Sequence, residues 1–386
     1  MNRSVLHTWD VFCKIVDNHG DIGVCWRLCQ QLAHEHALKV RLFIDDMPAA
    51  AHIVPQLNPK LAQQDIAGVT LCAWPNEAIM PAANVLETFS CGLPPAYLEK
   101  MVAQQSHWIN LDYLSAEDWV ANFHGKPSPQ AQRPITKHFF FPGFETDTGG
   151  LLRERDLITE RIAYSKDRQA QRYFWQNVLG QTDLRQIQNS LKISLFCYPQ
   201  ANVPALLAGL YSLDQAVTLF FPASLLHSAI DLFPDFERAA DLSLRKHNIT
   251  VQPIAFLSQA NYDRLLWSCD CNFVRGEDSW VRAIWAGQAF IWQPYIQEEG
   301  LHLKKMQAFL DRYSKQANPQ LASLLNAAHF AWSDAKTHDS KIFAALMQSL
   351  NMAKEHAQVE ASRLAKQPDL LSKLLSFNEK LIENKV

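Results

Sequence analysis

The sequence lacks the features that would place the protein in a membrane, outside the cell or on nucleic acid. No stretch approaches the roughly 18 uninterrupted apolar residues of a membrane span. Residues 1–10 lack the basic, apolar and small-residue segments of a signal peptide. The formal net charge is only −3, whereas a nucleic-acid-binding protein is usually clearly basic. We therefore expect a soluble, cytoplasmic protein that binds neither a membrane nor nucleic acid.

The eight cysteines lack the spacing of a disulfide framework or a metal site. Four occur singly in apolar runs, namely Cys13, Cys72, Cys91 and Cys197. The other four form two pairs without C-x-x-C spacing, Cys25 with Cys29 and Cys269 with Cys271. No partner histidines complete a zinc site. Small buried thiols are common in protein cores, so we expect reduced structural cysteines and no bound metal.

What the chain does contain is enough apolar sequence for two domains. It has 386 residues, of which 48% are hydrophobic and 19% charged, as in a globular protein. Apolar runs alternate with helical patterns at 11–16, 39–44, 68–72 and 84–89, and again at 191–196, 216–221, 249–253, 269–274 and 289–292. This rhythm is typical of parallel sheets covered by helices. We expect two doubly wound α/β domains with a cleft between them and a helical tail from about residue 339 to residue 383.

Residues 127–150 interrupt this alternation with prolines, glycines and the aromatic run 139–144. The segment is either a crossing between domains or a loop that lines a cleft. Several adjacent exposed phenylalanines would be unfavourable, so we expect the aromatic run to be packed. We place the domains at 1–150 and 151–354, with a C-terminal helix at about 355–386 that packs back on the first.

The most informative segment is 17–23, Asp-Asn-His-Gly-Asp-Ile-Gly, which follows the apolar run 11–16. Open α/β folds place their chemistry at the carboxyl ends of strands, so Asp17 and Asp21 are candidates for an active-site base. A plain turn between strand and helix explains the same residues. Asp17 would then end the strand, Gly20 would take a left-handed conformation and Asp21 would cap the helix. The residues alone leave both interpretations open.

A second candidate site is 275–279, Arg-Gly-Glu-Asp-Ser, between an apolar run and a helical pattern. Backbone N–H groups at a helix start bind phosphate oxygens, and Gly276 would let the backbone approach closely. Arg275 could add a bidentate contact to a diphosphate. The structural alternative is that Asp278 or Ser279 caps the helix.

Aromatic residues follow two further strand-like runs. Phe256 and Gln259 could stack on a base and bond its edge, although the residues alone favour a core Phe256 and an exposed Gln259. Phe196 and Tyr198 leave another strand end, where Tyr198 could face the cleft and packing explains both rings equally well.

Taken together, these segments resemble the EarP family, the protein-arginine rhamnosyltransferases that modify translation elongation factor P in bacteria. Residues 12–24 resemble its opening motif, 139–144 and 148–150 its mid-chain signature, and 275–279 its C-terminal motif. The resemblance runs from about residue 8 to residue 305. The remaining residues resemble the family only in length and helicity.

The resemblance implies the GT-B glycosyltransferase architecture, in which two Rossmann-like domains face a cleft. It implies transfer of L-rhamnose from dTDP-β-L-rhamnose to an arginine side chain of elongation factor P, with inversion of the anomeric centre and without a metal or another cofactor. The C-terminal domain would bind the nucleotide sugar and the N-terminal domain the acceptor protein. Alternatives are a GT-B enzyme with another nucleotide sugar or acceptor, and a non-catalytic protein that binds a nucleotide sugar or translation factor.

The resemblance also assigns roles by motif position. Asp21 becomes the general base, and Asp17 supports it or orients the acceptor guanidinium. Glu277 resembles the family's essential acidic residue, which would position Arg275 or the donor. Seven residues are assigned to the donor: Phe196, Tyr198, Phe256, Gln259, Arg275, Asp278 and Ser279. Among these, the last three would hold the diphosphate, Phe256 would stack on thymine and Gln259 would bond its edge.

Overall fold

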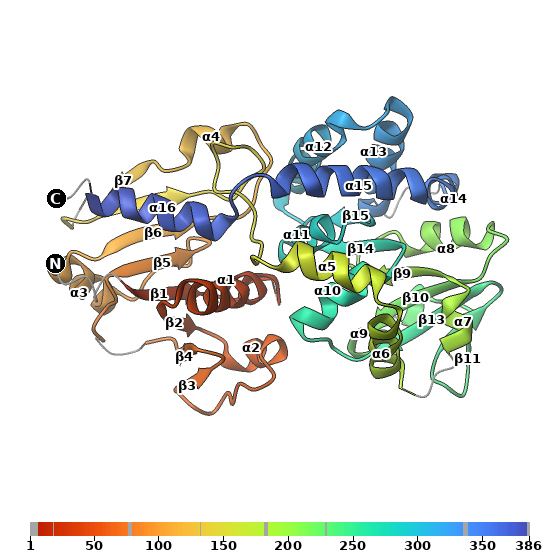
Figure 1. Ribbon diagram of the computed structural model, residues 1–386, viewed down its shortest axis with the longest axis horizontal. Helices are drawn as coiled ribbons and strands as arrows, with labels where there is room; N and C mark the ends of the chain where they lie inside the picture. Colours follow the sequence, from red (N-terminus) through yellow and green to blue (C-terminus); the bar gives the residue numbers. More distant parts are fainter. Residues whose placement is uncertain are drawn as a thin grey trace. The chain divides into compact units, whose positions relative to one another are not determined.

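The computed structural model describes residues 7–17, 19–75, 79–131, 133–180, 184–227, 230–334 and 339–383 (Figure 1). The chain divides into an N-terminal unit, Met1–Arg155 with Ala365–Val386, and a C-terminal unit, Asp156–Leu364. The division lies five residues beyond the expected one. The segment that returns to the N-terminal unit begins at Ala365, because nearly all of α15 (Leu350–Ala365) belongs to the C-terminal unit.

The N-terminal unit is built on an eight-stranded sheet in the order β3-β4-β2-β1-β5-β6-β8-β7. Its strands are β1 (Thr8–Cys13), β2 (Lys39–Ile44), β3 (Gln63–Ile66), β4 (Val69–Ala73), β5 (Asn84–Thr88), β6 (His107–Leu111), β7 (Pro127–Pro129) and β8 (Thr136–Phe140). The edge strands β3 and β7 are antiparallel to their neighbours, and the other pairings are parallel. Successive strands run outward from β1 on one side and then restart at β5 on the other. The topological switch point therefore lies between β1 and β5.

Helices cover both faces of this sheet, namely α1 (Gly20–His36), α2 (Met47–Ile53), α3 (Pro95–Gln104), α4 (Trp119–Phe123) and α16 (Leu370–Glu383). Side chains alternate along β1, so Val11 faces the core under α1 and α16, whereas Phe12 faces the core under α3. Leu371 of α16 is fully buried in the first of these cores. Asn378 of the same helix donates a hydrogen bond to the Asn84 side chain at 2.9 Å. The C-terminal helix is thus an integral part of the N-terminal unit.

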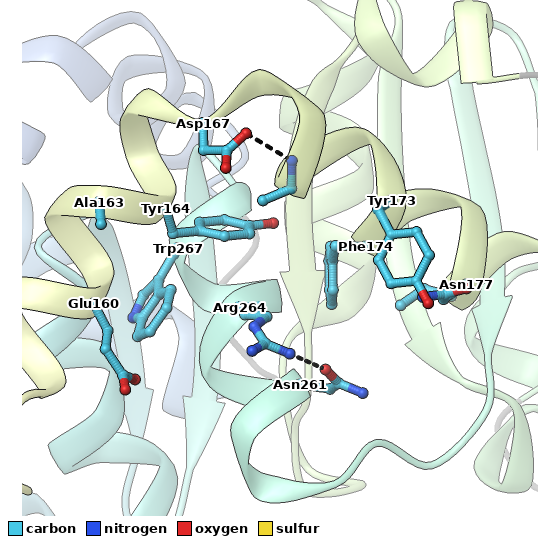
Figure 2. A pocket seen from close by; sticks show the side chains of 12 residues that line it. Glu160, Ala163, Tyr164, Asp167, Tyr173, Phe174, Asn177, Asn261, Arg264 and Trp267 are labelled. Carbon is cyan, nitrogen blue, oxygen red and sulfur yellow. Dashed lines mark hydrogen bonds between the residues drawn. The ribbon is translucent and has the colours of Figure 1, made fainter.

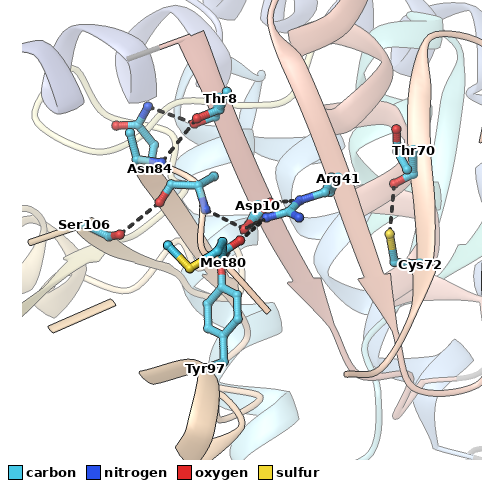
Figure 3. Close-up of polar contacts among 11 residues, drawn as sticks. Thr8, Asp10, Arg41, Thr70, Cys72, Met80, Asn84, Tyr97 and Ser106 are labelled. Atoms are coloured by element: carbon cyan, nitrogen blue, oxygen red, sulfur yellow. Dashed lines mark hydrogen bonds and ion pairs between the residues drawn. The ribbon is translucent and has the colours of Figure 1, made fainter. Parts of the chain in front are cut away.

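A buried carboxylate fixes the first half of β1 (Figure 3). Asp10 accepts two hydrogen bonds from the Arg41 guanidinium, both at 2.7 Å, one from the backbone N–H of Ala82 at 2.8 Å and one from the Tyr97 hydroxyl. Its donors come from β2, α3 and the loop before β5, and they satisfy both carboxylate oxygens. Asp10 therefore has a structural role.

Of the two expectations for 127–150, one is wrong and the other is confirmed. The segment is not merely a crossing or a loop, because it contains β7 and β8, which extend the sheet. The aromatic run is packed as expected, since Phe140, Phe141 and Phe144 are buried. Strand β7 was not predicted because Pro127 and Pro129 argue against a strand, and proline is found in sheets mainly at edges such as β7.

The C-terminal unit has a seven-stranded sheet in the order β11-β12-β13-β10-β9-β14-β15. Its strands are β9 (Leu191–Leu195), β10 (Val217–Pro222), β11 (Glu237–Arg238), β12 (Leu244–Lys246), β13 (Ile249–Ile254), β14 (Cys271–Arg275) and β15 (Ala289–Gln293). The pairings of β12 with β11 and with β13 are antiparallel, and the pairings from β13 through β10, β9 and β14 to β15 are parallel. The switch point here lies between β9 and β14.

Most of the remaining chain in this unit is helical. The helices are α5 (Leu157–Lys166), α6 (Arg168–Leu179), α7 (Leu184–Gln188), α8 (Val203–Tyr211), α9 (Ala223–Leu226), α10 (Gln259–Ser268), α11 (Asp278–Ala286), α12 (Leu301–Tyr313), α13 (Pro319–Ser333) and α14 (Lys341–Gln348), followed by α15. The expected helical tail is confirmed in α14, α15 and α16. In the ranges given above, no helix is both long enough and apolar enough to cross a bilayer.

Candidate active site

Asp21 lies in the first turn of α1, immediately after the switch point of the N-terminal sheet, and is only 2% exposed. Its Oδ2 accepts hydrogen bonds from the backbone N–H groups of Val16 at 2.7 Å and Asp17 at 2.9 Å. The Tyr113 hydroxyl donates to Oδ1 at 3.3 Å. Three donors therefore hold the carboxylate over the loop that precedes the helix.

This geometry overturns the interpretation of 17–23 as a plain capped turn. Gly20 is the first residue of α1 and does not have a positive φ, and the N-cap of the helix is His19, whose side chain makes no capping bond. Asp21 bonds the preceding loop instead of capping its own helix. Asp17 does not end the strand, since β1 stops at Cys13. Asn18 of the motif lies outside the described residues.

Asp17 lies beside Asp21 at the start of the helix. Its backbone carbonyl accepts a hydrogen bond from Gly20 N–H at 2.7 Å. A Cβ atom at position 20 would lie 3.0 Å from Asp17 Oδ2, so glycine allows this carboxylate to approach the helix. The two aspartates are thus brought together, as the sequence predicts.

The environment of Asp21 favours proton acceptance. Burial raises the pKa of this carboxyl above the ordinary value of 3.8, and the charge of Asp17 raises it further. The hydrogen bonds from Asp17, Val16 and Tyr113 act in the opposite direction but do not cancel the rise in pKa. A carboxylate with a raised pKa is a stronger base than a solvated one.

Sequence reasoning missed Tyr113, which follows β6, and Phe89, which follows β5. Their rings stack with centroids 4.3 Å apart and an interplanar angle of 14°. Phe89 and Ser90 both have a positive φ, of 55° and 53°, a backbone conformation that is unfavourable for residues other than glycine. The Asn110 side chain stabilises this turn by accepting a hydrogen bond from Ser90 N–H at 3.1 Å. The turn supports the ring whose hydroxyl binds Asp21.

In the C-terminal unit, three of the predicted donor residues meet at the switch point. Arg275 is the last residue of β14, and Phe196 and Tyr198 follow the neighbouring strand β9. The guanidinium carbon of Arg275 lies 4.4 Å from the ring centroid of Phe196 and 4.5 Å from that of Tyr198. These cation–π contacts hold the guanidinium at the carboxyl edge of the sheet.

The start of α11 lies directly beyond Arg275. Gly276 has a φ of +65°, which gives the sharp turn between strand and helix. Glu277 occupies the N-cap but makes no capping bond, and Asp278 and Ser279 are the first two helical residues. The expectation that Asp278 or Ser279 caps the helix is therefore wrong. The first N–H groups of a helix have no partner within it, so this end can receive an anion.

Gln259 is the first residue of α10, and Phe256 lies in the segment that precedes this helix. Phe256 is 47% exposed, so its interpretation as a core residue is wrong. Gln259 is half-buried and opens α10, which the Ser258 hydroxyl caps. One turn later, Tyr262 brings its ring to 6.2 Å from Phe196, a contact that the sequence did not reveal.

A buried ion pair joins α10 and α11, the helices that begin at Gln259 and Asp278. Arg282 of α11 donates two hydrogen bonds to the Asp263 carboxylate of α10, both at 2.8 Å. Both side chains are nearly inaccessible to solvent. The helix starts at Gln259 and Asp278 are thus held by a rigid connection.

A separate pocket of about 490 Å³ lies among α5, α6 and α10 (Figure 2). Aromatic side chains such as Tyr164 and Trp267 line it, together with Arg264, which bonds Asn261 at 2.9 Å. None of the predicted site residues lines this pocket. It is therefore distinct from the cluster around Arg275.

The predicted state of the cysteines is confirmed, since all eight are unpaired. Within the described part of the chain, no three His, Cys, Asp or Glu side chains are grouped so that they could hold a metal ion.

Comparison with known proteins gives consistent matches along the whole chain. The family described as "Elongation-Factor P (EF-P) rhamnosyltransferase EarP" matches residues 9–379. A protein-arginine rhamnosyltransferase of Pseudomonas putida is 42% identical over 386 residues, which cover 96% of this chain and 98% of that protein. A protein of the same description from Neisseria meningitidis is 32% identical over 409 residues and covers 98% of this chain and 99% of its own.

Solved structures show the same relationship. The structure described as "Structural basis for EarP-mediated arginine glycosylation of translation elongation factor EF-P" matches with a TM-score of 0.66 and 32% identity, over 97% of this chain and 99% of its own. The calicheamicin glycosyltransferase CalG4 matches with a TM-score of 0.50 and 11% identity, over 97% and 98% of the two chains, and so shares the fold alone. The predicted fold class, two Rossmann-like α/β units of the GT-B type with a helical C-terminal region, is confirmed.

Proposed function

The chain belongs to the EarP family of rhamnosyltransferases, and from this premise we propose that it transfers L-rhamnose from dTDP-β-L-rhamnose to an arginine side chain of elongation factor P in the cytoplasm. The observation that carries the proposal is that a candidate base lies at the switch point of one sheet and a candidate anion-binding group at the switch point of the other. A buried carboxylate with a raised pKa, Asp21, follows β1, and a stacked guanidinium, Arg275, ends β14.

In this proposal Asp21 is the general base. An arginine guanidinium is protonated at neutral pH and is a poor nucleophile. A terminal nitrogen of the acceptor attacks the anomeric carbon, the bond from that carbon to the diphosphate oxygen breaks, and Asp21 takes a proton from the attacking nitrogen. Asp17, held beside Asp21, orients the guanidinium. The hydrogen bonds to Asp21 fix its carboxylate before the substrate arrives.

The departing diphosphate would be stabilised by Arg275 and the first turn of α11. Arg275 supplies a fixed positive charge, and Asp278 and Ser279 lie in the first turn of α11, at the positive end of the helix dipole. Glu277, immediately before them, would position Arg275. We assign the charge stabilisation to these groups and propose that no metal or other cofactor takes part.

The base of the nucleotide would lie over Phe256. An exposed aromatic ring is a platform for a planar base, and the exposure of Phe256 supports this role. Gln259, at the start of the following helix, would bond the edge of thymine.

We propose inversion at the anomeric carbon. In an inverting displacement, the attacking group and the leaving group lie on opposite faces of the sugar. The proposed base belongs to one unit and the proposed diphosphate residues to the other. This supports inversion, because such a reaction needs the base and the leaving group on opposite faces of the sugar.

The test is transfer with purified components. Incubation of the chain with elongation factor P and dTDP-β-L-rhamnose should add one deoxyhexose to one arginine, as measured by mass spectrometry of the intact acceptor and its peptides. NMR of the glycopeptide should show the α-anomer, and EDTA should not change the rate. An unmodified acceptor, or faster use of another nucleotide sugar, would overturn the proposal. An acceptor with lysine in place of the modified arginine is the control.

A further inference from the structure

The Gln293 side chain carries a buried hydrogen-bond donor without a partner. Gln293 is the last residue of β15 and is 1% exposed. Its Oε1 accepts a hydrogen bond from the backbone N–H of Tyr198 at 2.8 Å. Its Nε2 has no hydrogen-bond partner among the residues that the structure describes. Buried polar atoms are almost always paired, so this amide indicates a missing acceptor.

The orientation of the amide is determined by its neighbour. A backbone N–H can only donate, so the atom that faces Tyr198 N must be the carbonyl oxygen. The other end of the side chain is therefore an NH₂ group, which can only donate. The missing partner must be an acceptor.

The position of Gln293 indicates which acceptor this is. Gln293 pairs with Arg275 in the register of β14 and β15, and its backbone carbonyl accepts a hydrogen bond from Gly276 N–H at 3.2 Å. Tyr198, which its side chain holds, is one of the two rings that stack on Arg275. The amide thus belongs to the cluster at the start of α11. An oxygen of an anion attracted by Arg275 is the acceptor that this position favours.

We propose that Gln293 is a further donor-binding residue, whose Nε2 donates a hydrogen bond to a diphosphate oxygen of the nucleotide sugar. Its Oε1 at the same time fixes the backbone of Tyr198. The inference rests on the proposed function and deepens it, because it adds a neutral contact to the charged contact from Arg275. The hydrogen bond would favour a thymidine diphosphate over thymidine alone.

Binding of dTDP and of thymidine to the full chain tests this role. Gln293→Glu keeps an acceptor for Tyr198 N–H but removes the NH₂ donor, and Gln293→Met removes the donor without adding charge. Both variants should bind dTDP about tenfold more weakly or worse, since a hydrogen bond to a charged group is lost. Their affinity for thymidine should not change. Isothermal titration calorimetry measures dTDP, and ligand-observed NMR measures thymidine.

Gln288→Glu is the matched control, because Gln288 precedes β15 at its amino end and donates to the Trp267 carbonyl at 3.1 Å. It should bind dTDP like the wild type, and thermal unfolding should show that every variant is folded. Equal losses for dTDP and thymidine would show a structural role and overturn the inference, as would a loss in Gln293→Glu alone. A wild type that does not bind dTDP would instead contradict the proposed function. Wild-type binding with unchanged Gln293 variants overturns this inference only.

Discussion

The guanidinium carbon of Arg275 lies 4.4 Å from the centroid of the Phe196 ring, across the ends of two neighbouring parallel strands. A second ring, that of Tyr198, lies 4.5 Å from the same carbon. The planar guanidinium is therefore held in place before any ligand binds. A side chain that is already ordered loses less conformational entropy when it binds an anion.

The stacked arrangement predicts that lysine cannot replace Arg275. Arg275→Lys keeps the charge but loses the planar, bidentate group, so dTDP affinity should fall about tenfold, or roughly 1.4 kcal/mol. Phe196→Leu should weaken binding less, and the double variant should lose less than the sum of the two, because the residues act together. Calorimetry with dTDP measures all three. Arg264→Lys, in the separate pocket of Figure 2, is the control that should bind normally. Additive losses would contradict the coupling.

The exposure of Phe256 predicts an effect on binding without an effect on stability. Phe256→Ala should weaken dTDP binding by about 1–3 kcal/mol, the contribution of stacking on one base. The thermal unfolding midpoint should barely change, because the ring is already 47% exposed. A core phenylalanine would instead lose about 3–5 kcal/mol of stability on the same substitution. Tyr173→Ala removes another exposed aromatic side chain, 66% exposed, and should not alter dTDP binding.

The sequence predicted most strands of both sheets, including the edge strand β15, and missed the short strands β3, β7, β11 and β12 as well as β8. Central strands are buried on both faces, so β2 and β14 appear as apolar runs. The short edge strands lack this signal. In β11 both residues are exposed, and β7 reads Pro-Ser-Pro. Such strands follow from pairing with a neighbour, which the local sequence does not encode.

The sequence predicted the grouping of site residues only where those residues are close together in the chain. Asp17 and Asp21 share one turn, and 275–279 share another, so their grouping could be predicted from the strand ends. Tyr113 and Gln293 come from other strands, and only the sheet topology brings them to Asp21 and Tyr198. The direction of the Asp21 carboxylate, toward the preceding loop instead of the helix, depends on backbone geometry that residue types do not reveal. The family resemblance, and not the local chemistry, pointed to arginine as the acceptor.

The hydrogen bond from Tyr113 predicts a shift in the pH dependence of transfer. Asp21 must be ionised to accept a proton, so kcat/KM should fall as the pH falls through the pKa of Asp21, which burial places above 3.8. The Tyr113 hydroxyl lowers this pKa, so Tyr113→Phe should raise it and move the acidic limb of the profile to higher pH. The rate at the plateau should change less than the position of the limb.

A matched control is available in the same unit. The Tyr97 hydroxyl donates to a different aspartate, Asp10, so Tyr97→Phe should leave the acidic limb where it is in the wild type. Rate profiles that begin below pH 3.8, with transfer followed by mass spectrometry, compare the three proteins. Superimposable limbs for the wild type and Tyr113→Phe would contradict the assigned role of Asp21 as the base.

Burial of Asp21 also predicts a conflict between stability and activity. Its folded-state pKa lies above the value of an unfolded aspartate, so the folded protein holds the proton more tightly. The unfolding free energy of the wild type therefore falls as the pH rises through this interval, since the buried carboxylate becomes charged. Asp21→Asn keeps an oxygen for the N–H groups of Val16 and Asp17 but never acquires the charge. Relative to the wild type, its thermal unfolding midpoint should rise as the pH rises from below 3.8 to neutrality.

The same substitution should reduce transfer by about 10²–10⁴-fold, the typical contribution of a general base. Glu99→Gln removes an exposed carboxylate from α3 and is the control for the loss of one negative charge. Midpoints for Asp21→Asn and the wild type that change in parallel with pH would show that the carboxylate is not destabilised by burial.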